Sequence, residues 1–139
     1  MKVLLAVDGS SYTKKMLAYL AAHDMYSPQH QYTAFTAQLL LPAQARTALG
    51  TELVNKYYED EAQHVMVPVT KFLAQHSISA ACLWKTGKPG ELISEIATEG
   101  KFDLIVMGSH GHGALLNLVV GSVVTEVLAA CKIPVLIVR

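Results

Sequence analysis

Short apolar runs alternate with longer amphipathic segments along the chain, and this alternation limits its possible folds more than any other feature. The apolar runs are Val3–Val7, Tyr32–Ala37, Ile78–Trp84, Asp103–Met107 and Pro134–Val138. The helical patterns between them cover Ser11–Ala22, Glu52–His76, Glu91–Glu99 and Val123–Cys131. Strands that alternate with helices favour parallel pairing through right-handed crossovers. We therefore expect a Rossmann-like α/β fold: an open, doubly wound, five-stranded parallel sheet in strand order 3-2-1-4-5, with helices on both faces.

Two segments depart from the simple alternation. Leu39–Pro42 and the residues up to Gly50 show no clear period, so we expect a long connection able to act as a mobile flap. Within the Glu52–His76 pattern, Pro68 lacks an N–H and is expected to kink or divide the helix. The apolar residues at helical spacing predict an inward face made of Leu53, Tyr57, Val65, Val69, Phe72 and Leu73.

Composition narrows the class of protein. With 139 residues and 52% hydrophobic content, the chain fits one domain over residues 1–139. Its 11 basic and 11 acidic side chains cancel, which disfavours nucleic acid and anionic membranes as partners. Cys82 and Cys131 stand in apolar settings without metal-type spacing, so we expect buried, reduced thiols rather than a disulfide. The apolar start is too short for a signal peptide, and we expect a cytoplasmic protein.

A glycine-rich segment follows the fourth predicted strand. Gly108-Ser109-His110-Gly111 comes directly after that strand, and Gly121-Ser122 follows a spacer of nine residues. Glycine has no Cβ, so backbone N–H groups can approach an anion closely. We expect Ser122 to be the N-cap of the last helix, whose free N–H groups and dipole favour negative charge. The segment is therefore predicted to bind phosphate.

Topology places a second loop opposite this one. In such a sheet, ligands bind beyond the carboxyl ends of the strands where the strand order reverses, between the first and fourth strands. Asp8-Gly9-Ser10 leaves the first strand and should face the glycine-rich loop across this crevice. Asp8 also fits a simple turn that opens a helix, and Gly108 fits close packing of strand on helix.

The same residues offer little for catalysis or metal binding. The chain has no G-x-x-x-x-G-K-(S/T) loop, and Ser10 stands where aspartyl-phosphate hydrolases place a second acid. His110 lacks an evident catalytic partner, and we expect a solvent-facing loop residue. The histidines form no compact ligand motif, so we assign neither catalytic residues nor a metal site.

Gly108-x-x-Gly111, nine residues and then Gly121-Ser122 resemble the signature of ATP-binding universal stress proteins of the UspA type. Val7-Asp8-Gly9-Ser10 and Pro134–Val138 add to this resemblance, which spans essentially the whole chain. It implies ATP as the ligand, either alone or with Mg²⁺, and a homodimer that pairs the edge strands Val135–Val138. The nucleotide-binding residues that it implies are Ala6, Val7, Asp8, Ala37, Met107, Gly108, His110, Gly111, Gly121, Ser122 and Val123.

By that resemblance, Ala6 and Val7 would flank the base, and Asp8 would contact the ribose or lie near the phosphates. The backbone of Ala37 would meet the adenine edge. The leading hypothesis is an adenine-nucleotide-binding protein that acts as a stress-response sensor or signalling module. Two alternatives stay open: a slow Mg-dependent ATPase, and a structural or adaptor dimer without nucleotide.

Overall fold

The computed structural model describes residues 1–112 and 117–139, so part of the spacer between Gly111 and Gly121 lies outside the described residues. Its five strands form one parallel sheet in the order β3-β2-β1-β4-β5, which confirms the predicted α/β fold. The strands are β1 (Lys2–Ala6), β2 (Gln31–Gln38), β3 (Ala80–Thr86), β4 (Leu104–Gly108) and β5 (Val135–Val138). The helices are α1 (Ser11–Ala22), α2 (Ala43–Leu49), α3 (Thr51–Gln75), α4 (Pro89–Glu99) and α5 (Ser122–Ala130).

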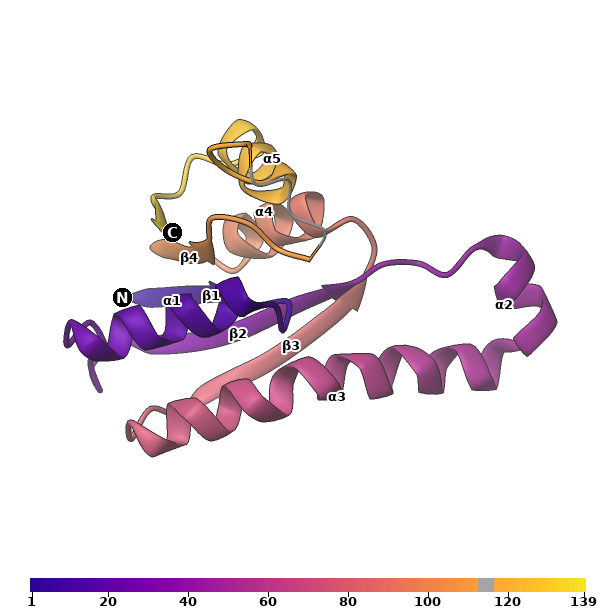
Figure 1. Cartoon of the computed structure of the whole chain (residues 1–139), viewed down its shortest axis with the longest axis horizontal. Coiled ribbons are helices and arrows are strands. Elements are labelled where there is room, and N and C mark those ends of the chain that lie inside the picture. The colour runs from indigo at the N-terminus through magenta and orange to yellow at the C-terminus, as the bar shows by residue number, and fades with distance from the viewer. Residues whose placement is uncertain (113–116) are drawn as a thin grey trace.

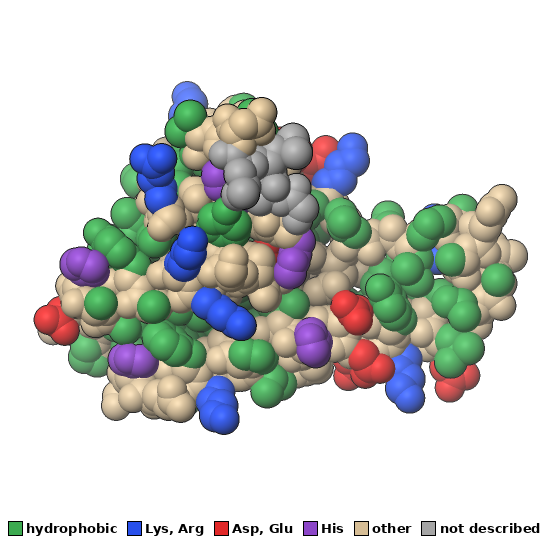
Figure 2. Space-filling model, viewed as in Figure 1, with side chains coloured by type: hydrophobic (Ala, Val, Ile, Leu, Met, Phe, Trp, Pro, Cys, Tyr) green, Lys and Arg blue, Asp and Glu red, His purple; other side chains and the backbone are tan. Residues whose placement is uncertain are grey.

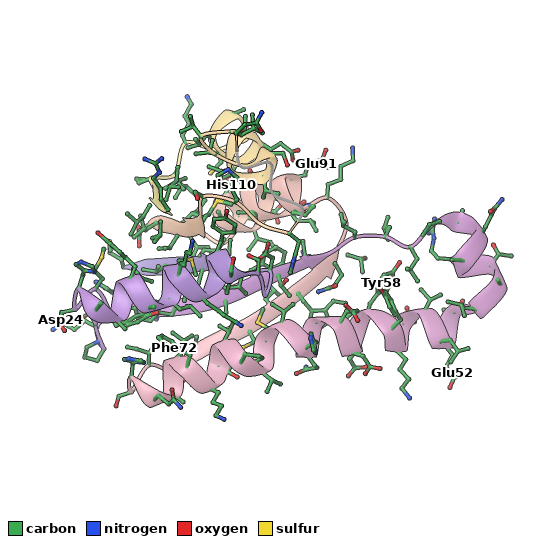
Figure 3. All side chains as sticks on the ribbon, viewed as in Figure 1. Asp24, Glu52, Tyr58, Phe72, Glu91 and His110 are labelled. Atoms are coloured by element: carbon green, nitrogen blue, oxygen red, sulfur yellow. The ribbon has the colours of Figure 1, made fainter. Side chains whose placement is uncertain are left out.

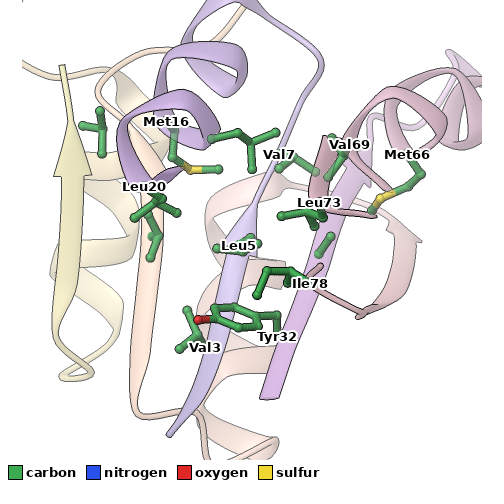
Figure 4. Close-up of a cluster of buried hydrophobic side chains, with 14 residues drawn as sticks. Val3, Leu5, Val7, Met16, Leu20, Tyr32, Met66, Val69, Leu73 and Ile78 are labelled. Atoms are coloured by element: carbon green, nitrogen blue, oxygen red, sulfur yellow. The ribbon is translucent and has the colours of Figure 1, made fainter. Parts of the chain in front are cut away.

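Helices cover both faces of the sheet, with α1 and α3 on one side and α4 and α5 on the other (Figure 1). Successive side chains of a strand point to opposite faces, so a strand covered on both faces must be apolar throughout. In β1, Val3 and Leu5 enter the core under α1 and α3, shown in Figure 4, while Leu4 enters the core under α4 and α5. The continuous apolar run of β1 is thereby explained.

The segment after β2 is more ordered than its sequence predicts. Instead of a flap without regular structure, residues Ala43–Leu49 form α2, and Gly50 turns the chain into α3 with a φ of 81°. The Gly50 N–H donates to the Arg46 carbonyl oxygen at 3.1 Å, and the Val54 N–H donates to the Gly50 carbonyl oxygen at 3.1 Å. The expected flap is therefore a short helix joined by a glycine turn to the next one.

Pro68 does not divide α3, which runs unbroken from Thr51 to Gln75. A proline inside a helix frees the carbonyl four residues earlier, here that of His64. Both Pro68 and His64 are exposed, so water can satisfy the freed group. The expected division was wrong because the proline lies on the solvent side of the helix.

The first half of α3 faces the core with a different set of residues from the predicted one. Val54 and Tyr58 are each only 6% exposed, whereas Leu53 is 56% and Tyr57 43% exposed. Leu53/Val54 and Tyr57/Tyr58 are adjacent apolar pairs with the same spacing, so periodicity alone could not choose between them. The buried face of α3 consists of Val54, Tyr58, Ala62, Met66, Val69 and Leu73.

The cysteines also differ from expectation. Cys82 is exposed on β3, the strand at one edge of the described sheet, while Cys131 is half-buried. Both thiols are free. Among the helices of the described residues, none has the length and hydropathy needed to cross a lipid bilayer.

The burial of α3 predicts unequal costs for two equal truncations. Leu73 is 1% exposed in the core under α1 and α3, so Leu73→Ala should lower the free energy of unfolding by about 2–5 kcal/mol. Leu53→Ala, at an exposed position of the same helix, should change it by less than about 0.5 kcal/mol. Urea denaturation measures both, and a larger loss in Leu53→Ala would contradict the assigned face.

Candidate functional site

The loops that leave β1 and β4 meet across the carboxyl edge of the sheet. The two strands are neighbours, with Ala6 paired to Met107 at their ends. The His112 backbone N–H donates to Asp8 Oδ2 at 3.2 Å, and His112 Nε2 lies 2.7 Å from the Asp8 carbonyl oxygen. The predicted convergence of Asp8-Gly9-Ser10 with the glycine-rich loop is therefore observed. His112, which makes the contact, was not singled out from the sequence as a site residue.

Asp8 is held in place by the start of α1. Its Oδ1 accepts hydrogen bonds from the Ser10 N–H and from the Thr13 hydroxyl, both at 2.9 Å. The Thr13 hydroxyl oxygen also lies 3.0 Å from the Asp8 N–H and accepts from it. Asp8 thus closes a turn, as an aspartate commonly does, and its second oxygen faces the opposite loop. Thr13 is the positioning residue that sequence reasoning missed, because only the fold shows that its hydroxyl reaches back to Asp8.

The surroundings of Asp8 favour its ionised form. Burial raises the pKa of this carboxyl, but Ser10 and Thr13 as hydrogen-bond donors, together with nearby His112, outweigh burial and lower the pKa below its ordinary value. The site therefore presents a carboxylate at neutral pH. A carboxylate is a hydrogen-bond acceptor only, which suits hydroxyl groups as ligands.

Close approach of backbone explains two of the signature glycines. A Cβ on Gly108 would lie 2.8 Å from the Tyr12 Cβ and 3.1 Å from the Tyr12 carbonyl oxygen, so this glycine lets β4 pack on α1. A Cβ on Gly111 would lie 2.4 Å from Asp8 Oδ2. Gly111 is thus required for the loop to approach the carboxylate, a packing role that its sequence position did not reveal.

Gly121 links the start of α5 to the same loop. Its N–H donates to the Ser109 carbonyl oxygen at 2.7 Å, and a Cβ there would lie 3.3 Å from the His110 Cα. Gly121 is also the N-cap of α5, and Ser122 is the first helical residue. The prediction of Ser122 as N-cap was wrong, because Gly121 adopts the extended cap conformation with a φ of −74° and a ψ of 170°.

His110 is anchored rather than directed into solvent. Its Nδ1 lies 3.0 Å from the Ser109 hydroxyl, and its Nε2 lies 3.0 Å from the Leu118 carbonyl oxygen. The ring also lies 5.2 Å from the Tyr12 ring, centre to centre, and the residue is close to α5 (Figure 3). Both ring nitrogens are engaged, so in this geometry His110 orders the loop.

The remaining predicted residues divide between the two faces of the sheet. Ala6, Ala37 and Val123 border the core under α4 and α5, and Met107 belongs to it. Val7 is 5% exposed and belongs to the core under α1 and α3. Ala6, Ala37, Met107 and Val123 thus lie on one face of the sheet, and the Val7 side chain lies on the other.

Because the pKa of Asp8 is lowered in the folded protein, its contribution to stability should depend on pH. A carboxyl whose pKa is lowered by folding stabilises the native state above its unfolded pKa, and this contribution is lost as the pH falls through the native pKa. Asp8→Asn should therefore lower the unfolding free energy by about 1 kcal/mol near neutral pH, a value discounted for partial exposure. The difference from the parent chain should shrink below about pH 4.

Chemical denaturation at several pH values tests this expectation. Asp60→Asn, an exposed change on α3, is the matched control and should have little effect at any pH. A difference between Asp8→Asn and the parent chain that stays constant into acid would show that the charge of Asp8 does not stabilise the fold.

Comparison with known proteins identifies the family of this chain. The profile of the universal stress protein family matches residues 1–139. A universal stress protein from Thermus aquaticus is 31% identical over 142 residues, which include 99% of this chain and 97% of the relative. Universal stress protein Slr1230 from Synechocystis sp. is 28% identical over 138 residues, but this chain spans only 42% of its length.

Solved structures agree with the fold. MJ0577 from Methanocaldococcus jannaschii superposes with a TM-score of 0.83 at 26% identity and covers 99% of this chain, which in turn covers 94% of that structure. A universal stress protein family protein from Arabidopsis thaliana with AMP bound has a TM-score of 0.70 at 16% identity, covering 99% of this chain and 90% of that one. By profile, sequence and fold, the chain belongs to the universal stress protein family.

Proposed function

We propose that this universal stress protein binds an adenine nucleotide, ATP in particular, and acts in the cytoplasm as a sensor or signalling module. The observation that carries the proposal is the meeting of three elements at one edge of the sheet: the Asp8 carboxylate, the loop around Gly111, and the N-terminus of α5 at Gly121. A carboxylate suits ribose hydroxyls, and glycine-rich backbone beside a helix N-terminus suits phosphates. The fold is also shared with the AMP-bound protein from Arabidopsis thaliana.

The proposed roles follow from these positions. The ribose would take the place of the His112 N–H at Asp8 Oδ2, so binding would exchange the contact that now joins the two loops. His110 would order the loop, and Val7 would contribute only backbone, because its side chain is in the opposite core. Ala6, Met107 and Gly108 would border the base and ribose, Ala37 would offer its backbone to the adenine edge, and Gly111, Gly121, Ser122 and Val123 would hold the phosphates.

The exchange at Asp8 supplies a physical route from binding to signalling. A ligand changes a conformational equilibrium only through contacts that differ between the two states. Here the nucleotide and His112 compete for one carboxylate oxygen, so the loop after β4 would differ between the free and the bound protein. This route from binding to signalling needs no chemical reaction at the site.

Nucleotide binding is tested first by mass spectrometry of the small molecules released when freshly purified protein is denatured. ATP or another adenine nucleotide is expected in the released fraction. Isothermal titration should then show ATP binding that weakens by at least about tenfold in Gly121→Val, a loss of about 1.4 kcal/mol, because the added side chain occupies the phosphate path.

Ala129→Val, an exposed enlargement on the same helix, is the control and should bind ATP as the parent does. Circular dichroism of each variant shows whether the fold is retained. If a folded Gly121→Val variant bound ATP as tightly as the parent, the assigned phosphate site would be wrong. If no nucleotide is released on denaturation and added ATP does not bind, the result would favour the adaptor dimer instead.

We also propose a homodimer that pairs the β5 edges of two chains antiparallel. Among the residues that the structure describes, β5 pairs only with β4, so its outer edge offers unpaired backbone groups, and Val135, Leu136 and Ile137 are partly exposed. Antiparallel pairing of like edges about a two-fold axis would satisfy these groups in a closed assembly.

A lysine on the β5 edge should separate the subunits. Val135→Lys or Ile137→Lys places a charge beside the proposed seam, so light scattering after size exclusion should report the mass of one chain instead of two. Ala81→Lys changes an exposed residue of β3, at the opposite edge of the sheet, and should leave the dimer intact. Dimers that persist in both β5 variants would place the interface elsewhere.

A further inference from the structure

A solvent-open cavity of about 310 Å³ lies away from Asp8 and the glycine-rich loop, between the chain that leaves β2, helix α2 and the first turns of α3, and four of its six lining residues are exposed. Its volume is at the lower end of the range for ligand pockets, about 300–1,000 Å³. No residue of the proposed nucleotide site lines it. The lining residues are Leu40, Arg46, Thr51, Val54, Asn55 and Tyr58.

Hydrogen bonds tie the walls of the cavity together. The Leu41 N–H donates to the Tyr58 hydroxyl at 2.9 Å, which joins the chain after β2 to α3. The glycine turn at Gly50 then sets α2 back against α3. None of the α2 residues is buried, so core packing alone does not account for this helix.

The polar groups of the cavity are rich in hydrogen-bond donors and carry positive charge. Within the described residues, no hydrogen bond or ion pair engages the side chains of Arg46, Thr51 or Asn55. The Tyr58 hydroxyl accepts from Leu41 and keeps its own proton for donation. The lining contains no acidic side chain, and Figure 3 shows Glu52 on the side of α3 opposite Tyr58.

The rest of the lining is apolar. Leu40, Val54 and the Tyr58 ring supply it; Val54 and Tyr58 are each 6% exposed, whereas Leu40 is 55% exposed. Exposed Leu39, Leu49 and Leu53 add apolar surface nearby. Hydrophobic side chains gather at the right of Figure 2, where α2 and the first half of α3 project beyond the sheet. A ligand that fits this lining has an anionic end and a hydrocarbon end.

We propose that this cavity binds a small amphiphilic carboxylate, with its anionic head on Arg46 and its apolar tail against Leu40, Val54 and Tyr58. Guanidinium pairs with carboxylate through two parallel hydrogen bonds, a stronger and more directional contact than neutral groups make. Thr51 and Asn55 supply further donors for the head. The carboxylate site is separate from the proposed nucleotide site, and its proposal does not depend on nucleotide binding.

The proposal is tested by titrating ¹⁵N-labelled protein with octanoate, octanol and octylammonium and following the backbone amide shifts. Octanoate should give saturable shifts confined to amides of residues 40–58. Octanol and octylammonium should bind there at least about fivefold more weakly, because only the carboxylate pairs with Arg46.

Arg46→Gln should weaken octanoate binding by at least about fivefold while leaving octanol binding unchanged. Lys56→Gln removes an exposed cation of α3 that does not line the cavity, and it should bind octanoate as the parent does. The amide spectrum of each variant reports its fold. The proposal is overturned if octanoate causes no saturable shift at residues 40–58, if octanol or octylammonium binds equally well, or if Arg46→Gln and Lys56→Gln behave alike.

Discussion

The parallel pairing of β1 with β4 is the contact on which the functional part of the structure depends. It joins strands that are about a hundred residues apart in the chain, and it brings the ends of both strands to one edge of the sheet. The Asp8 carboxylate and the glycine-rich loop meet only because of this pairing. The residues proposed to contact the nucleotide lie at the ends of β1 and β4, in the loops that follow these strands, on neighbouring β2 and at the start of α5.

Polar contacts then give this edge its shape. Thr13 holds one oxygen of Asp8, and His112 holds the other, so the carboxylate joins α1 to the loop after β4. Gly111 is needed where the loop approaches that carboxylate, and Gly121 links the loop to α5 through Ser109. The signature glycines therefore have structural reasons as well as a proposed ligand. The geometry of the proposed phosphate site is built by contacts within the protein itself.

The arm made of α2 and the first half of α3 follows different rules from the body of the fold. It extends past the sheet in Figure 1, and α2 buries no residue. Its order comes from a glycine turn and from the Tyr58 hydroxyl, and these contacts lie beside the open cavity that Arg46 lines. The body carries the proposed nucleotide site, and the arm carries the proposed carboxylate site.

The sequence by itself determined the fold class, the strand order and the two loops of the crevice, because apolar runs and glycine turns are local signals that imply a parallel sheet. It could not choose Tyr58 over Tyr57, since both fit the same period, and it did not reveal that residues Ala43–Leu49 form a helix. Only the tertiary structure decided that Gly111 makes room for Asp8, and that Thr13 and His112 hold its carboxylate. These facts depend on side chains meeting across the sheet edge, and no pattern along one segment of chain records such a meeting.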